Sequence, residues 1–227
     1  DTLYAGKGGI EKLLNTGEEN GTSWIPAEVD VSIRPGWFYH AEEDSLVKTP
    51  EQLFDIYLTS VGRGANLILN IPPDRRGLIN EIDVASLEGW KKLIDERFST
   101  NLALNKAVSA SSVRGDSPAY QASLVTDGNK DTYWATNDEE KSGTLEVDLG
   151  ENKRISYVLV QEYIKLGQRV KSFSVEIEKE GQWQEVARGT TIGYKRILRI
   201  DPVDAQKVRV IIKDSKACPL ISNIEIY

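Results

Sequence analysis

The sequence predicts a multi-domain protein, with the closing part of an α/β domain over residues 1–100 and an all-β sandwich over residues 101–227. Two observations support this division. Residues 1–100 combine helix patterns with a long apolar strand, whereas residues 101–227 hold many short strand candidates and no clear long helix. The charge also changes: the first piece has 17 acidic and 10 basic side chains, and the second has 18 of each. The net charge of −7 therefore belongs to the first piece.

The first elements of the α/β piece are a strand and a helix. Val29, Val31 and Ile33 alternate with polar residues, which predicts a short strand with one apolar and one polar face. Residues 49–52 (TPEQ) are typical of a helix start, with Thr as the N-cap, Pro in the first turn and Gln completing a capping box. Gly62 and Gly64 are expected to end this helix.

A buried strand and a second helix follow. The nearly continuous apolar run at residues 65–71 (ANLILNI) predicts a parallel strand covered on both faces. A helix is expected from about Ile82 to Phe98, with Leu87, Trp90, Leu93 and Ile94 on its buried side. This alternation is typical of a (β/α) barrel or a doubly wound sheet. Because a complete barrel needs about 250 residues, these residues supply only the last few elements.

The strand candidates of the second piece are separated by Gly-containing turns, such as residues 127–129 and 180–181. They span residues 144–149, 155–162, 172–178, 183–187, 197–200, 208–212 and 221–227. Many short strands at this spacing favour a β-sandwich of the jelly-roll type.

The composition excludes several classes of protein. A content of 40% hydrophobic and 28% charged residues is that of a globular protein. The chain has no basic run, which argues against nucleic acid and anionic membranes, and no apolar stretch long enough for a membrane span. The single Cys218 and the single His40 leave no internal disulfide and no histidine-rich metal site. Since the chain begins at Asp1 and lacks Met, we expect an internal fragment or a processed product.

Residues 24–40 concentrate groups suited to sugar chemistry. Aromatic rings stack on the apolar faces of sugars, and carboxylates bind their hydroxyls. A glycosidase needs two carboxyl groups, one of them kept protonated by apolar surroundings so that it can donate to the leaving oxygen. Glu28, which follows Trp24, Ile25 and Pro26, fits the proton donor. The alternative is that Glu28 and Arg34 form a structural ion pair.

Two sequence blocks carry a family resemblance. Residues 26–40 (PAEVDVSIRPGWFYH) and 60–77 (SVGRGANLILNIPPDRRG) resemble the end of the catalytic barrel in α-L-fucosidases of glycoside hydrolase family 29. The resemblance covers about residues 1–100 and is strongest to the branch that acts on α-1,3/1,4-linked fucose. It implies the C-terminal portion of a (β/α)8-type barrel and a retaining, exo-acting mechanism, with an Asp as nucleophile and a Glu as acid/base. The nucleophile of this family belongs to an earlier strand, so we expect it upstream of this chain and expect the fragment alone to be inactive.

The resemblance places the general acid/base at Glu28. Asp30 lies only two residues away, and we do not assign it as the nucleophile. Substrate binding is predicted for Trp37, Asp44 and Arg34, with Trp37 in the wall of the fucose pocket. Two alternatives stay open. The acidic cluster at residues 42–44 either supplies the acid/base in place of Glu28 or binds substrate, or it is a solvated charge run. Trp37 is either a pocket residue or a core residue.

The second piece resembles the discoidin, or coagulation factor 5/8 type C, domain. The resemblance rests on residues 101–112, 122–134, 143–150, 167–176, 189–198 and 221–227. Bacterial versions attached to glycosidases are carbohydrate-binding modules, which implies a bacterial parent that is periplasmic or extracellular. The resemblance also implies a structural Ca²⁺ with the ligands Leu124, Asp127, Asn129, Thr132 and Glu225. Independently, residues 127–132 place oxygen donors at close intervals around a Gly turn, as Ca²⁺ requires; the alternative is a capped turn without an ion.

The expected partners are fucosylated oligosaccharides or glycoprotein glycans, together with the missing upstream barrel segment, present as part of the same protein or as a separate chain. Neither nucleic acid nor membrane insertion is expected. Tyr163, Arg169 and Tyr194 are candidates for sugar contact in the sandwich, although residues 101–227 lack the usual galactose-type His. Two alternatives to a fucosidase remain, namely a catalytically inert carbohydrate-binding or scaffolding fragment and a barrel hydrolase of another family.

Overall fold

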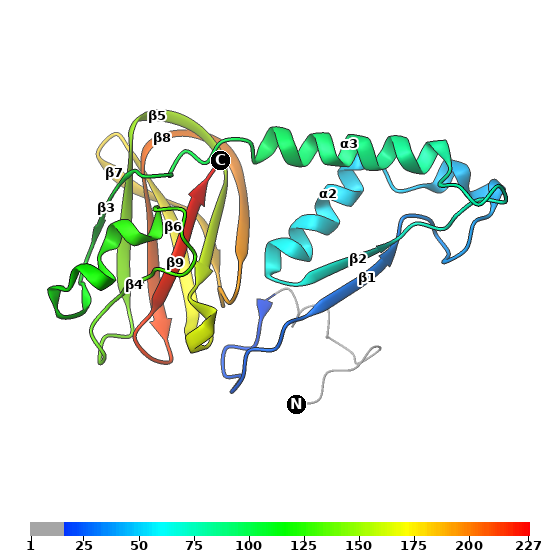
Figure 1. Cartoon of the computed structure of the whole chain (residues 1–227). Helices are drawn as coiled ribbons and strands as arrows, with labels where there is room; N and C mark the ends of the chain where they lie inside the picture. The colour runs from blue at the N-terminus through cyan, green and yellow to red at the C-terminus, as the bar shows by residue number, and fades with distance from the viewer. Residues whose placement is uncertain (1–15) are drawn as a thin grey trace. The chain divides into compact units, whose positions relative to one another are not determined.

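The computed structural model describes residues 16–227 (Figure 1). The chain divides into two compact units: residues 26–100 form one, and residues 101–227 form the other together with the described residues 16–25. The sequence had assigned all of residues 1–100 to the first piece. Residues 16–25 instead group with the sandwich because their contacts are made with its loops. Residues 1–15 lie outside the described part of the chain.

The unit of residues 26–100 has a strand–helix–strand–helix order. Its elements are β1 (Glu28–Ser32), η1 (Ala41–Leu46), α2 (Pro50–Thr59), η2 (Val61–Arg63), β2 (Asn66–Asn70) and α3 (Glu81–Arg97). Strands β1 and β2 are parallel, with Glu28 opposite Asn66 and Ser32 opposite Asn70. Both helices lie on one side of this two-stranded sheet (Figure 1).

The opposite face of the sheet is open in the described structure. Glu28, Asp30 and Ile68 on this face are exposed, and 42% of the Ile68 surface is accessible to solvent. The prediction that residues 65–71 are covered on both faces is therefore wrong for the described part of the chain, because helices cover only one face. A parallel sheet that is solvated on one side is unusual, since parallel sheets are normally buried on both.

The two helices begin at well-formed caps. The Thr49 hydroxyl accepts the Gln52 N–H, and the Gln52 side chain accepts the Thr49 N–H, so the predicted capping box is confirmed. Helix α3 begins after Asn80, whose side chain accepts the Ile82 N–H. Its fully or nearly buried residues are polar, Asp83 and Ser86, whereas the predicted apolar positions are only half-buried. The sequence pattern missed this polar face because both residues bind partners distant in sequence.

The second unit is a mostly antiparallel, sandwich-like β domain. Its strands are β3 (Ala107–Ala110), β4 (Trp134–Ala135), β5 (Gly143–Glu162), β6 (Val170–Lys179), β7 (Gln182–Gly189), β8 (Arg196–Ser215) and β9 (Leu220–Ile226). Short helical turns connect them: η3 (Arg114–Asp116), η4 (Pro118–Tyr120), η5 (Ala122–Val125) and η6 (Ile164–Leu166). Every predicted strand segment lies within or overlaps one of these strands.

The two longest strands, β5 and β8, belong to both layers of the sandwich. Residues 143–148 of β5 pair with 207–212 of β8, and residues 157–160 pair with 196–199. The register shifts between these halves, where both strands bend. Strands β3, β6 and β7 extend one half, and β4 and β9 extend the other. The sequence divided each long strand in two because the bends carry turn-forming and polar residues.

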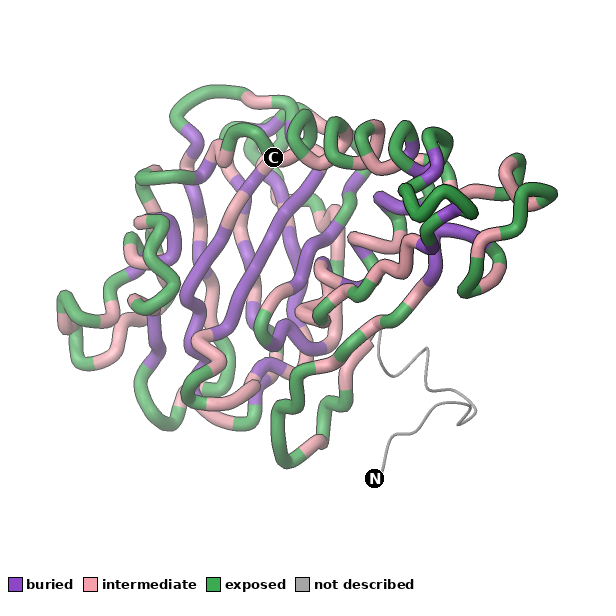
Figure 2. Tube along the Cα trace, turned by 45° about the vertical axis from the view of Figure 1, so that its right-hand side comes forward, coloured by how far each residue is buried: buried purple, intermediate pink, exposed green. Residues whose placement is uncertain are grey.

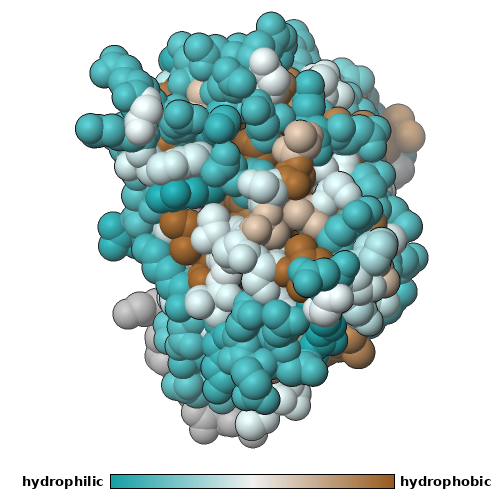
Figure 3. Space-filling view, turned by 90° about the vertical axis from the view of Figure 1, so that its left-hand side faces the viewer, coloured by the Kyte–Doolittle hydropathy of each residue, from teal (hydrophilic) through white to brown (hydrophobic). Residues whose placement is uncertain are grey.

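The sandwich core is continuous along the strands (Figure 2). Trp134 is fully buried in it, and its indole N–H donates to the Ser112 carbonyl over 2.8 Å, as expected for a core tryptophan. Hydrophilic side chains cover most of the face in Figure 3, and its hydrophobic areas are small. None of the described helices is long and apolar enough to cross a membrane.

Candidate active site

Glu28 begins β1 and lies on the open face of the two-stranded sheet. Asp30 and Ser32 share this face because side chains alternate along a strand, and Asn66 and Asn70 lie opposite on β2. Glu28 is exposed, as are Trp24 and Ile25, which keep 36% and 75% of their surfaces. The apolar surroundings that the sequence predicted for the proton donor are thus not supplied by these described neighbours.

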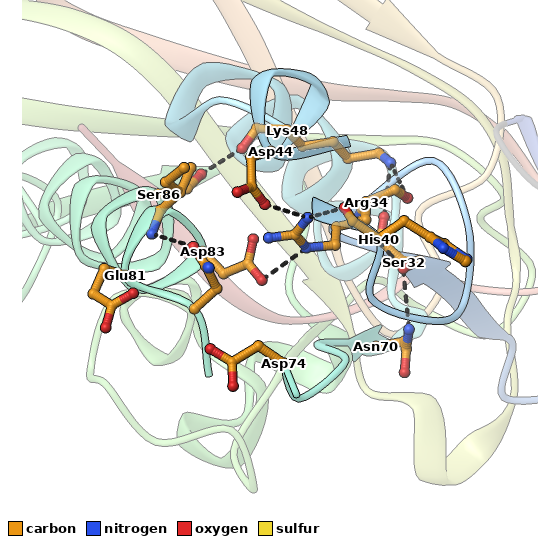
Figure 4. Close-up of polar contacts among 12 residues, drawn as sticks. Ser32, Arg34, His40, Asp44, Lys48, Asn70, Asp74, Glu81, Asp83 and Ser86 are labelled. Carbon is orange, nitrogen blue, oxygen red and sulfur yellow. Dashed lines mark hydrogen bonds and ion pairs between the residues drawn. The ribbon is translucent and has the colours of Figure 1, made fainter. Parts of the chain in front are cut away.

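A polar network shapes the loop that follows β1 (Figure 4). The Asn70 amide donates to the Ser32 hydroxyl over 3.0 Å and to the Trp37 carbonyl over 3.1 Å. The Ser32 hydroxyl in turn donates to the Gly36 carbonyl over 2.7 Å. The loop folds back on the carboxyl ends of both strands and leaves Trp37 and Phe38 51% and 77% exposed. Trp37 is therefore not a core residue in the described structure, and its ring is available to a ligand.

Arg34 is the buried centre of an ion network (Figure 4). Its Nε lies 3.0 Å from Asp83 Oδ2, its Nη1 lies 2.9 Å from Asp44 Oδ1, and its guanidinium stacks on Tyr39 at 4.6 Å from the ring centre. Burial lowers the pKa of Arg34, but hydrogen bonds to the two carboxylates outweigh it, and the net effect is a raised pKa. The ion pair between Arg34 and Glu28 that the sequence left open is not formed, because Arg34 pairs with Asp44 and Asp83 instead.

This network determines what Arg34 and Asp44 can do. Arg34 is fully buried, whereas the Asp44 side chain is 31% exposed. Arg34 Nη1 also donates to the His40 carbonyl over 3.3 Å, so one guanidinium connects the loop after β1 with η1 and α3. The geometry thus assigns Arg34 to positioning the loop. Of the pair, only Asp44 has side-chain surface left to meet a substrate.

A polar cavity of about 490 Å³ lies among the loops that follow the two strands. It is lined by Tyr39, His40, Ala41, Glu42, Asp74, Arg75, Arg76, Asn80 and Glu81. Arg76 bridges Asp74 and Glu81, and its hydrogen bond holds the pKa of Asp74 below the ordinary value. The pKa of Glu81 is lowered by its own backbone N–H and then by Arg76. None of the four site residues predicted for this unit lines this cavity.

The three sugar-contact candidates of the sandwich have different surroundings. Tyr163 stacks on Tyr133 with ring centres 4.4 Å apart, within a half-buried aromatic cluster. Arg169 Nη1 donates to the Cys218 carbonyl over 2.9 Å, which ties it to the loop before β9. Tyr194 is 41% exposed and lies against Trp24 of the N-terminal segment, with ring centres 6.3 Å apart. None of these contacts brings Tyr163, Arg169 and Tyr194 together into one binding platform.

The predicted Ca²⁺ ligands converge in part. Thr132 Oγ lies 2.7 Å from Asp127 Oδ2 and 2.8 Å from the Asn129 carbonyl, so three of the five oxygen donors meet around one turn. Glu225 accepts hydrogen bonds from Asn223 and Tyr227 on its two oxygens. The gathered donors are all oxygens, which suits Ca²⁺. No cluster of three or more His, Cys, Asp or Glu side chains occurs in the described part of the chain, so the set depends on carbonyls and a hydroxyl.

Comparison with known proteins places this geometry in a family. Residues 10–95 match the α-L-fucosidase family, and residues 107–224 match the F5/8 type C domain. The chain is 39% identical over 215 residues to "Alpha-L-fucosidase 1" of Arabidopsis thaliana and 41% identical over 220 residues to its counterpart in Oryza sativa subsp. japonica. This chain contains an F5/8 type C domain, which follows a segment that matches the α-L-fucosidase family.

Solved GH29 structures are similar to nearly the whole chain. SpGH29 is 41% identical with a TM-score of 0.86, covering 95% of this chain and 47% of its own. A Ruminococcus gnavus GH29 fucosidase in complex with fucose is 35% identical with a TM-score of 0.85, covering 93% of this chain and 43% of its own. A chitosan-binding module from Paenibacillus is 23% identical and supports the fold of the sandwich alone. The chain spans 42% of the length of each plant fucosidase that it matches.

Sequence reasoning missed several residues that shape this fucosidase-family site. Asn70 and Ser32 hold the loop that carries Trp37, and Asp83 completes the pairing of Arg34. The alternation along residues 66–70 was a usable signal, because it places Asn70 on the same strand face as Asn66. Asp83 gave no comparable signal, since an acidic residue in the first helical turn is ordinary.

Proposed function

We propose that this chain is the C-terminal part of a retaining exo-α-L-fucosidase that hydrolyses terminal α-1,3/1,4-linked fucose from glycans, with Glu28 as general acid/base and an Asp nucleophile upstream. The observation that carries the proposal is the position of Glu28. It is an exposed carboxyl on the polar, open face of a βαβα unit, in a chain about 40% identical to α-L-fucosidases over nearly all its length. The βαβα unit would form the last part of a (β/α)8 barrel, with this face turned to the barrel interior.

The chemistry assigned to each residue follows from its surroundings. Glu28 would protonate the leaving oxygen and then deprotonate the water that releases fucose. The exposed ring of Trp37 would pack against the apolar face of the sugar, and the free edge of Asp44 would accept a hydrogen bond from a hydroxyl. Arg34 would act through the loop rather than on the sugar, because it has no exposed surface.

The test uses a protein that contains this chain and the upstream part of the fucosidase family. With a natural fucosylated oligosaccharide, Glu28→Gln should lose at least about 10²-fold in kcat, the scale of general acid–base catalysis. An activated aryl fucoside needs no acid, so it should still form the fucosyl–enzyme, and added azide should accelerate turnover with release of fucosyl azide. Asp30→Asn on the same strand face is the matched control and should change kcat far less.

The place of Glu28 at the amino end of β1 makes a comparison with other carboxyls necessary. Active sites of (β/α)8 barrels lie at the carboxyl ends of the strands, where the acidic cluster of residues 42–44 follows β1. Glu42→Gln and Glu43→Gln should therefore be measured beside Glu28→Gln. Full activity of Glu28→Gln together with loss of activity and azide rescue in Glu42→Gln or Glu43→Gln would reassign the acid/base to this cluster.

We also propose a structural Ca²⁺ in the F5/8 type C domain, held by Asp127 and Thr132 side chains and by carbonyls of the same turn, with Glu225 closing the site. The support is the convergence of the Asp127, Asn129 and Thr132 oxygens. At a Ca²⁺ concentration 100 times Kd, the ion should stabilise the domain by about 2.7 kcal/mol, and a chelator should remove this. Asp127→Asn should abolish the effect, whereas Asp131→Asn, whose carboxylate pairs with Lys165, should retain it. Equal melting temperatures with and without Ca²⁺ would contradict the proposal.

A location outside the cytoplasm completes the proposal, because fucosylated glycans are displayed on secreted and cell-surface molecules. We place the parent protein in the periplasm or outside the cell. Fractionation of the source cells followed by immunoblotting tests this, and recovery in the cytoplasmic fraction alone would refute it.

A further inference from the structure

The segment of residues 16–25, which we call the entry segment, is held along its length by loops of the sandwich. The Thr191 hydroxyl donates to the Thr16 carbonyl over 3.0 Å, and the Thr190 hydroxyl donates to the same carbonyl. Further along, Lys216 Nζ donates to the Gly21 carbonyl. At its end the Trp24 ring lies against Tyr194, with ring centres 6.3 Å apart and planes at 47°. Contacts at both ends and in the middle of the entry segment restrict its movement more than a single contact could.

The fit between the entry segment and the sandwich is close at two glycines. Gly17 has φ +76°, and a Cβ built there would overlap the Thr191 side chain. On the sandwich side Gly193 has φ +65°, and a Cβ there would lie 2.9 Å from Gln168 Oε1 and 3.6 Å from Trp24 Nε1. Both positions require a residue that adopts left-handed backbone and leaves space for the partner.

The loop that contains Gly193 and Tyr194 contacts the entry segment, and buried polar side chains of β5 bind its backbone. The Glu162 carboxylate, 2% exposed, accepts the Gly193 N–H over 2.7 Å. The Gln161 amide, also 2% exposed, donates to the Tyr194 carbonyl over 2.9 Å. Because its backbone is fixed by these bonds, the loop offers a preformed surface to the entry segment.

The entry segment leads directly into β1. Trp24 is four residues before Glu28, a distance that an extended chain spans in at most about 14 Å. An anchored Trp24 therefore leaves only these few residues of chain between the sandwich and the start of β1. A displacement of about 1 Å at a catalytic group costs up to roughly 10²-fold in rate.

We propose that the F5/8 type C domain positions the catalytic segment, with Thr190, Thr191, Tyr194 and Lys216 as positioning residues that act through residues 16–25 on Glu28. This rests on the proposed role of Glu28 and deepens it. The sandwich then contributes to catalysis, independently of any glycan that it binds itself.

The first test is hydrogen exchange of the chain as it stands, measured by mass spectrometry on peptides that cover residues 16–27. Thr190→Val with Thr191→Val removes both hydroxyl donors at nearly constant shape, and exchange in the peptides should become about tenfold faster, the ratio for loss of about 1.4 kcal/mol. The pair Thr190→Ser with Thr191→Ser keeps the hydroxyls and should exchange like the parent. Unchanged exchange in the valine variant would overturn the docking.

Two further pairs separate docking from general loss of stability. Tyr194→Ala should accelerate exchange in residues 16–27, while Tyr194→Phe keeps the ring contact and should not. Lys216→Ala should also accelerate exchange in residues 16–27. Lys153→Ala, at a lysine whose ammonium pairs with Glu151, should leave this exchange unchanged. Peptides from β9 report on folding of the sandwich and should keep the parent rate in every variant.

The second test measures kinetics of the same variants in a protein with the upstream barrel. The Val pair and Tyr194→Ala should lower kcat roughly tenfold or more with little change in KM, and the Ser pair and Tyr194→Phe should restore it. Faster exchange with parent kcat would refute the positioning role while leaving Glu28 as acid/base. Full activity of Glu28→Gln would instead refute the proposed acid/base, whatever the exchange data show.

Discussion

Glu162 offers a prediction in which two physical effects oppose each other. Its carboxyl group is 2% exposed and accepts three backbone N–H groups, from Arg169 at 2.7 Å, Val170 at 2.9 Å and Gly193 at 2.7 Å. Burial raises the pKa of Glu162 to about 7, and the three N–H donors act in the opposite direction without cancelling it.

The sign of the effect on stability follows from this direction. The pKa in the unfolded chain is near 4.5, so between pH 4.5 and 7 the folded state binds more protons than the unfolded state. The contribution of Glu162 is therefore fully present below about pH 4.5 and is lost as the pH rises through 7. With about 1.4 kcal/mol for each pH unit, the loss amounts to roughly 3 kcal/mol.

The perturbation is Glu162→Gln, which removes the titration and turns one acceptor into an NH2 group facing a backbone N–H. At pH 5 the variant should be less stable than the parent by about 1–3 kcal/mol, the cost of the lost hydrogen bond. At pH 8 the difference should shrink by roughly 3 kcal/mol, because only the parent then carries a buried charge. Glu151→Gln, at a carboxyl 70% exposed, is the control and should show no such change.

The assay is equilibrium urea unfolding of the whole chain, followed by circular dichroism between pH 5 and 8, for parent and both variants. The carboxyl ¹³C shift of Glu162 gives its pKa directly. A parent that becomes more stable relative to Glu162→Gln as the pH rises would contradict the raised pKa of Glu162. In that case the three N–H donors outweigh burial, and the pKa of Glu162 lies below 4.5.

Two further predictions concern the unit of residues 26–100. Asp83→Ala should destabilise this unit by about 3 kcal/mol, because Arg34 then stays buried with one carboxylate fewer. Asp95→Ala breaks an exposed ion pair on the same helix and should cost under about 1 kcal/mol. The urea unfolding midpoints of the two variants test this difference. Thr49→Ala should cost about 1 kcal/mol through loss of the N-cap of α2, with Thr59→Ala at the other end of the helix as control. Equal thermal stability of the two Thr variants would contradict the role of the cap.

The sequence predicted the two long helices and most of the strands in their order, but not β3, β4 or the short helical turns. The capping box at Thr49, the alternation along β1 and the short strands after residue 101 are local patterns, and local patterns report on helix and strand because those structures depend on neighbours in sequence. Family motifs added Glu28 as the candidate acid/base. These features need no knowledge of which distant residues meet.

The partners of residues that are far apart in sequence follow only from the folded structure. Arg34 was expected to bind substrate or pair with Glu28, yet it is buried between Asp44 and Asp83, 49 residues away in sequence. The attachment of residues 16–25 to a loop about 175 residues later is likewise invisible in sequence. The sequence does not show which distant residue a charged side chain or a glycine will contact, because that depends on how the elements pack in three dimensions.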